Sequence, residues 1–234
     1  MKTGRLKNFL LELIFPEECL ACRRAGGLLC PICLAQLKFN TEERGATLEK
    51  NKLREIFIAG DYQDELLAEL IKKYKYHFLS RLGEILAQFL TRFWLNENTE
   101  KIYPLLKTLK TSPAEKIILI PIPLTKRRER WRGFNQAEIL ARALSTKLGY
   151  GLNLNLQRIK DRPAQATLDE KTRRANWSGV FYYEKTKTPI ISLNDKIIIL
   201  IDDITTTGAT LNAAAAALQV AGATEIYGLV LAKG

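Results

Sequence analysis

The chain has 234 residues, with a hydrophobic fraction of 47% and a charged fraction of 26%. Both fractions are typical of soluble globular domains, so composition gives no reason to expect a disordered or fibrous chain. The net charge of +11 favours anionic partners, which include phosphorylated small molecules, nucleic acid and anionic membrane surfaces.

The sequence contains no convincing export signal or membrane span. The apolar stretch 9–15 is short, Glu12 interrupts it, and Glu17, Glu18 and Cys19 follow where small cleavage-site residues would be expected. No run approaches the roughly 20 apolar residues that a membrane helix needs. We therefore expect a cytoplasmic protein without membrane insertion, beginning with a short amphipathic helix.

All four cysteines lie between positions 19 and 33. They form two pairs, Cys19-x2-Cys22 and Cys30-x2-Cys33. Two such pairs can direct four sulfurs at one tetrahedral ion, with Zn–S distances of about 2.3 Å. Gly26 and Gly27, between the pairs, give the chain the freedom to double back.

Other uses of these cysteines remain open at this stage. Two disulfides would imply a secreted protein, a redox site would need only one pair, and an iron–sulfur site would use the same ligands. Four thiolates leave no open coordination position for catalysis. We expect a structural zinc ion that stabilises a segment too short to form a core.

The polar stretch 38–52 predicts a linker, which divides the chain into a knuckle domain at 1–45 and a larger domain at 46–234. In the larger domain, short apolar runs alternate with segments of helical periodicity. The predicted strands are 56–59, 117–122, 152–156, 197–201 and 226–231, and the predicted helices include 66–71, 82–93 and Gln136–Leu148. In 152–156 leucines alternate with Asn153 and Asn155, which predicts a half-exposed strand. Strands that are apolar on both faces indicate an α/β fold with a mostly parallel sheet covered on both sides by helices.

The segment 197–210 is the most informative part of the sequence. Its apolar strand ends at Asp202 and Asp203, and parallel sheets bind ligands at this end of a strand. A small hydroxylated loop and a helix follow, and the N–H groups and dipole of a helix N-terminus suit a phosphate. The loop consists of Thr205, Thr206, Thr207, Gly208, Ala209 and Thr210.

This loop is neither a Walker A loop nor a dinucleotide-binding turn. Two carboxylates would repel a phosphate, so we expect them to face sugar hydroxyls or a metal ion while the loop holds a 5-phosphate. The alternative is that Asp202 and Asp203 only cap the helix and the threonines only fill a turn.

An apolar strand, Asp-Asp and Thr-Thr-Gly-x-Thr resemble the phosphoribosyl pyrophosphate (PRPP) signature of type I phosphoribosyltransferases. The double CxxC and three further segments look like the ComF family of competence proteins, and this resemblance covers nearly the whole chain. The segments are Leu-Ile-Lys-Lys-Tyr-Lys-Tyr at 70–76, Pro-Ile-Pro-Leu at 121–124 and Arg-Gly-Phe-Asn-Gln at 132–136.

The resemblance implies a role for each matching residue. Asp202 and Asp203 would hold the ribose hydroxyls, with Mg²⁺ bound largely by PRPP, and residues 205–210 would bind the 5-phosphate. Leu124, Thr125 and Lys126 would approach the pyrophosphate, with Thr125 standing where the family often has histidine. The segment 158–165 occupies the place of a flexible lid, and we expect its Arg162 among the catalytic residues with the two aspartates.

Basic residues gather in three clusters, at 72–75, 126–132 and 158–174. We expect some of these cations, Lys75 among them, to neutralise pyrophosphate, although charge runs usually form a solvated face. Cations with interleaved aromatic residues are also typical of grooves for single-stranded nucleic acid. Candidate residues for such a groove are Arg127, Arg128, Arg130, Trp131 and Arg132.

The sequence leaves two functions open. The first is an enzyme in which a nucleophile attacks C1 of PRPP and pyrophosphate leaves, without any covalently attached side chain. The second is a non-catalytic module that recognises PRPP or single-stranded DNA and works with a transformation helicase. The acceptor substrate is not readable from the sequence.

Overall fold

A computed structural model describes residues 17–41, 52–76, 79–159, 180–185 and 192–234. The predicted helix at 9–15, Arg162 and most of the segment 158–165 lie outside these ranges. Within the described ranges, every helix is too short or too polar to span a bilayer.

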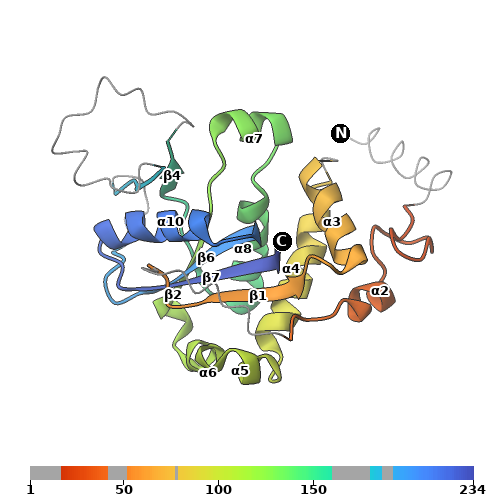
Figure 1. Cartoon of the computed structure of the whole chain (residues 1–234), viewed down its shortest axis with the longest axis horizontal. Helices are drawn as coiled ribbons and strands as arrows, with labels where there is room; N and C mark the ends of the chain where they lie inside the picture. Colours follow the sequence, from red (N-terminus) through yellow and green to blue (C-terminus); the bar gives the residue numbers. More distant parts are fainter. Residues whose placement is uncertain (1–16, 42–51, 77–78, 160–179, 186–191) are drawn as a thin grey trace, which may run out of the picture.

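The core of the molecule is a parallel sheet of five strands in the order β1-β7-β6-β2-β3 (Figure 1). The strand β6 is central and pairs with β7 on one side and β2 on the other. These strands are β1 (Ile56–Asp61), β2 (Ile117–Pro121), β3 (Gly151–Leu152), β6 (Ile197–Thr205) and β7 (Glu225–Lys233). A separate antiparallel pair comprises β4 (Leu156–Arg158) and β5 (Phe181–Tyr183).

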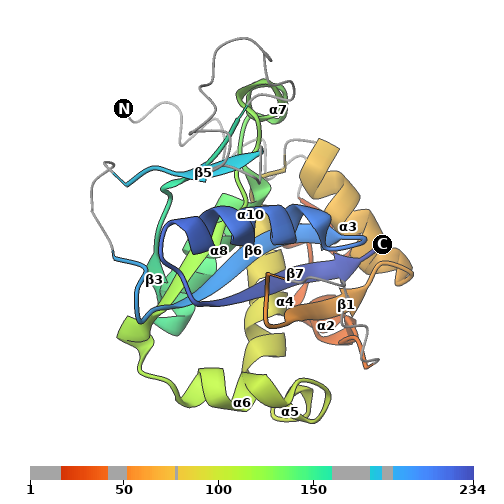
Figure 2. The ribbon, with the colours of Figure 1, turned by 60° about the vertical axis from the view of Figure 1, so that its left-hand side comes forward.

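Helices cover both faces of the sheet, as the sequence predicts. In Figure 2, α10 lies in front of the sheet and α4 lies behind it. The helices are α2 (Pro31–Gln36), α3 (Glu65–Tyr76), α4 (Leu82–Leu95), α5 (Thr99–Ile102), α6 (Pro104–Thr111), α7 (Lys126–Arg132), α8 (Gln136–Leu148) and α10 (Ala209–Val220).

Alternate residues of β6 belong to two different apolar clusters. Ile199 and Ile201 pack with residues of α3, α4 and α8, whereas Ile198 and Leu200 pack with α10 on the opposite face. All four side chains are fully buried, and burial of such a side chain contributes about 1.5–3 kcal/mol. The continuous apolar run of this strand is therefore explained by a sheet covered on both sides.

The prediction for residues 152–156 is wrong in two respects. The chain leaves the main sheet after β3 and enters the separate ribbon at β4, so these residues do not form one strand. Asn153 and Asn155 are buried, each only 3% exposed. The Asn153 side chain donates to the Tyr183 hydroxyl at 3.0 Å and accepts from the Asn155 N–H at 2.9 Å. Hydrogen bonds thus compensate for the burial of these two side chains, which the alternating sequence pattern predicted to be exposed.

The cysteine segment packs directly on the larger domain through α2 and α4. Leu34 and Leu37 belong to the same apolar cluster as α4, and Arg92 of α4 donates to the Leu34 carbonyl at 2.6 Å. The beginning of the predicted linker is also packed, because Phe39 contacts Phe89 at a centroid distance of 5.5 Å. The Asn40 N–H donates to the Ala59 carbonyl of β1 at 2.9 Å, so this part of the linker continues the fold.

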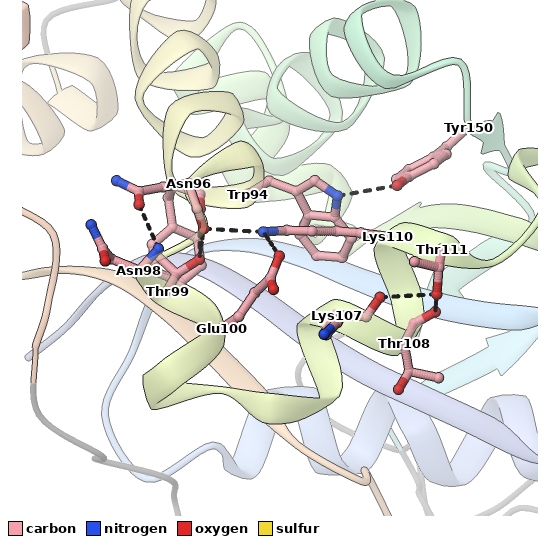
Figure 3. Close-up of polar contacts among 11 residues, drawn as sticks. Trp94, Asn96, Asn98, Thr99, Glu100, Lys107, Thr108, Lys110, Thr111 and Tyr150 are labelled. Atoms are coloured by element: carbon pink, nitrogen blue, oxygen red, sulfur yellow. Dashed lines mark hydrogen bonds and ion pairs between the residues drawn. The ribbon is translucent and has the colours of Figure 1, made fainter.

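A polar network ties α4, α5 and α6 together at the end of the molecule opposite α7 (Figures 1 and 2). In Figure 3, the Lys110 ammonium contacts the Glu100 carboxylate at 2.9 Å and the Asn96 carbonyl at 3.1 Å. Trp94 donates its indole N–H to the Tyr150 hydroxyl at 3.1 Å in the same view. Each of these contacts joins opposite or complementary groups, which is the usual arrangement for polar groups that hold helices together.

Candidate functional site

The candidate site lies at the carboxyl ends of β2 and β6. These strands are neighbours, and their register pairs Pro121 with Ile201, so the residues that follow them meet at one edge of the sheet. A hollow of about 150 Å³ opens there. Its lining residues are Lys75, Ile122, Leu124, Arg128, Arg132, Asn135, Gln136, Ala137, Arg158, Asp202, Asp203 and Thr210. We call it the inner hollow.

The two predicted aspartates differ in their charge partners. The Asp203 carboxylate forms an ion pair with the Lys75 ammonium at 3.0 Å, and both side chains are largely buried, at 10% and 16% exposure. Asp202 accepts from the Asp203 N–H at 2.8 Å. Burial and the neighbouring Asp203 charge raise the pKa of the Asp202 carboxyl to about 8, although Lys75 and Arg158 oppose this shift. Adjacent carboxyls with such an environment are typical of functional sites.

The predicted 5-phosphate loop connects β6 to α10. Thr205 is buried at the end of the strand, whereas Thr206 and Thr207 are exposed. Gly208 precedes the helix with a φ of 78°, a left-handed conformation that favours glycine. Neither aspartate caps α10, because both lie within β6. The capping alternative is therefore wrong, and the aspartates are free to face the inner hollow.

The helix opens within reach of this hollow. Ala209 and Thr210 form its first turn, both are exposed, and Thr210 also lines the inner hollow. The Thr207 hydroxyl accepts from the Ala209 N–H at 3.4 Å. The structure thus brings hydroxyl groups and a helix N-terminus beside the two aspartates.

The three residues predicted to approach pyrophosphate have different surroundings. Leu124 lines the inner hollow. Thr125 is buried and caps α7, since its hydroxyl accepts from the Arg128 N–H at 3.4 Å. Lys126 is exposed at the start of α7 and is not among the residues that line the hollow.

Sequence reasoning assigned two arginines of the inner hollow to nucleic acid and did not assign two polar neighbours. Arg128 and Arg132 line the hollow together with Asn135 and Gln136. The Asn135 side chain accepts from the Ala137 N–H and donates to the Ile122 carbonyl, both at 3.1 Å. These contacts fix the start of α8 against the end of β2. The segment 132–136 is recognisable in the sequence. The sequence alone does not show that its side chains line a cavity or which groups they contact.

Gln136 and Arg132, which both line the hollow, carry buried donors. The Gln136 side chain is 1% exposed, and its Oε1 accepts from Arg132 Nη1 at 3.0 Å. Its Nε2 and the Arg132 Nε are both buried without a hydrogen-bond partner among the described residues. Two buried donors without acceptors are costly, and both belong to residues that line the hollow.

A second, wider hollow of about 800 Å³ adjoins the first. Its lining residues are Tyr76, Arg127, Arg128, Trp131 and Arg132, and we call it the outer hollow. The rings of Tyr76 and Trp131 lie 6.0 Å apart, and the Arg132 guanidinium stands 5.6 Å over the Tyr76 ring. The predicted Arg130 is exposed on α7 and lines neither hollow.

The four cysteines form a compact cluster with free thiols, which excludes the disulfide alternative for this structure. Their sulfurs all lie within 4.8 Å of one another, and those of Cys22 and Cys30 are 3.8 Å apart. Four sulfurs at about 2.3 Å from a tetrahedral ion would be separated by about 3.8 Å. The cluster therefore fits a metal ion such as zinc. Gly26 and Gly27 both have positive φ, which explains the turn between the pairs.

The thiols of the cluster differ in acidity. Burial of Cys19 opposes its ionisation, but backbone N–H groups of Cys22, Cys30 and Ala21 lower its pKa to about 6. Contact with the Cys30 side chain, together with burial, raises the pKa of Cys33 to about 12. Thiols must lose their protons to bind a metal, so binding here would release protons.

The chain is similar to several known proteins. The phosphoribosyl transferase domain family matches residues 132–234. The chain is 27% identical to Competence protein F of Haemophilus influenzae over 208 residues, which cover 87% of this chain and 84% of that protein. It is 28% identical to Competence protein ComFC of Bacillus subtilis over 219 residues, covering 89% and 81%. It is also 28% identical to the DNA utilization protein YhgH of Escherichia coli O157:H7, covering 82% and 79%.

The chain is thus similar to phosphoribosyl transferase domains at residues 132–234 and to competence proteins over most of its length. The domain match includes both aspartates, the loop at 205–210 and Gln136, but it excludes the cysteines, Lys75 and Arg128. The similarity to the two competence proteins extends over most of the chain and so beyond the matched domain. Residues from outside the matched domain thus complete the inner hollow.

Proposed function

We propose that this chain binds PRPP with Mg²⁺ in the inner hollow and acts as a phosphoribosyltransferase. The observation that carries this proposal is the pair of adjacent carboxyls, Asp202 and Asp203, facing a hollow that four cationic side chains also line. The cations are Lys75, Arg128, Arg132 and Arg158. A ligand for such a hollow needs hydroxyl donors for the carboxyls and anionic oxygens for the cations, and PRPP has both.

Each element of the site would have a separate task. Residues 205–210 and the first turn of α10 would bind the 5-phosphate. Asp202 and Asp203 would accept hydrogen bonds from the ribose hydroxyls, while Lys75 and the two arginines of α7 would neutralise the pyrophosphate. Mg²⁺ bound through PRPP would supply further charge neutralisation. We also propose that Leu124, Thr125 and Lys126 approach the pyrophosphate and that Arg162 contributes to catalysis.

The proposed reaction is a substitution at C1 of the ribose. The lone pair of the acceptor forms a bond to C1, the C1–O bond breaks, and pyrophosphate leaves with the electron pair. Positioning and charge neutralisation by the hollow would promote this step, and no protein side chain becomes attached.

The names of the relatives support a role in DNA metabolism. Two are competence proteins and one is a DNA utilization protein. We propose that this chain acts in DNA uptake and natural transformation, in the cytoplasm and together with a competence helicase.

We propose a structural zinc ion on Cys19, Cys22, Cys30 and Cys33, with the knuckle domain at 1–45 and the phosphoribosyltransferase-like domain at 46–234. The ion would complete a segment whose few apolar side chains rest on α4. Zinc content and thermal stability measured before and after chelation test this assignment, since loss of the ion should unfold the knuckle.

Calorimetric titration of PRPP with Mg²⁺ tests the inner hollow. We expect binding to the wild-type chain and a loss of about 10- to 100-fold in affinity for Asp203→Asn, because hydrogen bonds to charged groups contribute about 1.5–3 kcal/mol. Glu138→Gln is the matched control, since it makes the same change of charge on α8 outside the hollow.

Absence of heat from folded, metal-loaded wild-type protein would overturn the proposal. Equal affinities of wild type and Asp203→Asn would also overturn it, because the carboxyls would then not contact the ligand. Where binding is present, release of pyrophosphate in a screen of acceptors tests turnover.

A second candidate function is binding of single-stranded DNA at the outer hollow. The observation that favours it is the exposure of two large rings beside arginines, with Tyr76 52% and Trp131 58% exposed. Successive bases can stack on such rings while cations follow the phosphates. Arg127, Arg128, Arg130, Trp131 and Arg132 remain the residues proposed for this surface.

A further inference from the structure

The outer hollow is suited to a planar, anionic ligand. Arg127, Arg128 and Arg132 line it, and no acidic side chain does so among the residues that the structure describes. Tyr76 and Trp131 offer their rings to the same space, at 52% and 58% exposure. A base of any identity can stack on an aromatic ring, so single-stranded nucleic acid fits this combination of rings and cations.

Two arginines belong to both hollows. Arg128 and Arg132 line the inner hollow with the aspartates and the outer hollow with the aromatic rings. Arg132 contacts a residue of each hollow. Its Nη1 donates to Gln136 of the inner hollow at 3.0 Å, and its guanidinium lies 5.6 Å over the Tyr76 ring of the outer hollow. One guanidinium has a limited set of donors, so it cannot neutralise a full anion on each side at once.

We propose that single-stranded nucleic acid in the outer hollow and the pyrophosphate group of PRPP in the inner hollow compete for Arg128 and Arg132. Each ligand then weakens the binding of the other. This inference rests on the proposed binding of PRPP. If it holds, occupancy of the PRPP site regulates the affinity for nucleic acid. The two effects are equal by thermodynamic linkage.

The test is the affinity for a fluorescein-labelled oligothymidylate of about 15 nucleotides, close to the upper site size of a single-strand binding module. Fluorescence anisotropy measures it with Mg²⁺ alone, with Mg²⁺ and PRPP, and with Mg²⁺ and ribose 5-phosphate. We expect PRPP to weaken binding about tenfold, within the usual range of coupling between sites. Ribose 5-phosphate is the matched control, because it lacks the pyrophosphate group that would reach the shared arginines.

Variants on α7 separate shared from unshared arginines. Arg128→Gln should weaken binding of the oligonucleotide and reduce the effect of PRPP to about twofold, since a shared cation is lost. Arg127→Gln removes a cation that lines only the outer hollow, so it should weaken DNA binding and leave the tenfold effect of PRPP. Arg130→Gln removes a cation of the proposed DNA surface that lines neither hollow, so it should weaken DNA binding less than Arg127→Gln and leave the tenfold effect of PRPP.

Three results would overturn this inference. The first is that the oligonucleotide does not bind, and the second is that its affinity is the same with and without saturating PRPP. The third is that PRPP and ribose 5-phosphate change this affinity equally. Titration of PRPP without DNA is run in parallel. Its failure would contradict the proposed function itself, and its success combined with independent DNA binding would contradict only the competition.

Discussion

The two ends of the molecule handle buried charge in opposite ways. In the network of α4, α5 and α6, Lys110 meets the Glu100 carboxylate and a backbone carbonyl, so each charge has a partner. At the inner hollow, Asp203 is paired with Lys75, but Asp202 lies beside that second carboxyl, and Gln136 Nε2 has no acceptor among the described residues. The paired network stabilises helices, whereas the inner hollow retains unfavourable electrostatics. The difference indicates that function, and not stability, determines the residues of the inner hollow.

The largest effect is expected from breaking the paired network. Lys110→Met removes the partner of the Glu100 carboxylate, and both side chains are mostly buried, at 15% and 25% exposure. Removal of one partner of a buried pair costs about 3–5 kcal/mol, and the partial exposure here reduces this to about 3 kcal/mol. Urea unfolding measures the change. Lys107→Met, an exposed lysine on the same helix, should change stability by less than about 0.5 kcal/mol.

Substitution of Asp202 at the inner hollow should have the opposite effect on stability. The pKa of Asp202 is raised in the folded chain, so ionisation of this carboxyl destabilises the fold. This destabilisation is absent below the ordinary carboxyl pKa and grows as pH rises to about 8. Without ligand, Asp202→Asn should therefore be more stable than wild type above pH 8 and equal to it below pH 4, with the difference growing between these values. Thermal unfolding across this pH range measures the difference, with Glu138→Gln as the control. A constant difference at all pH values would contradict the assignment to ionisation.

A third variant tests a residue of the inner hollow whose groups are all paired. Asn135→Ala removes the cap of α8 and leaves the Ile122 carbonyl and the Ala137 N–H without partners. Loss of such a cap costs about 0.5–2 kcal/mol, and burial of both groups places this case near the upper limit. Unfolding by urea should show this loss. Asn135→Asp, which keeps the acceptor, should recover part of it.

The smallest change in stability is expected next to that residue. Gln136→Met removes a contact with Arg132 but also removes the buried Nε2 that has no acceptor among the described residues. These effects oppose each other, so the free energy of unfolding should change by less than about 1 kcal/mol. Binding of PRPP should nevertheless weaken. A loss of stability as large as that of Asn135→Ala would show that Gln136 has a structural role.

The sequence predicted those parts of the fold that depend on apolar periodicity. The buried strand β6 and the helix Gln136–Leu148 are where the pattern places them, because their side chains pack against a sheet. The helix α7 was not predicted, since Lys126–Arg132 has almost no apolar face. The burial of Asn153 depends on the Tyr183 hydroxyl, which lies 30 positions away in the sequence.

The same distinction holds for the site. The Asp-Asp and threonine loop was recognisable because its residues are contiguous. The ion pair of Lys75 with Asp203 joins α3 to β6, and the sharing of Arg128 and Arg132 between two hollows depends on the position of α7. Such contacts between distant segments leave no local pattern in a single sequence.

The pairing of β1 with β7 also has a consequence for the order in which the chain can fold. The first strand of the main sheet binds the last one, with Ile56 opposite Gly228. During synthesis from the N-terminus, β1 has no neighbour in this sheet until β7 has left the ribosome. Its apolar side chains must therefore be shielded through most of translation, by α4 or by a chaperone. Contacts of such large sequence separation also favour slow folding, so a chain that terminates early would expose an unpaired, aggregation-prone strand edge.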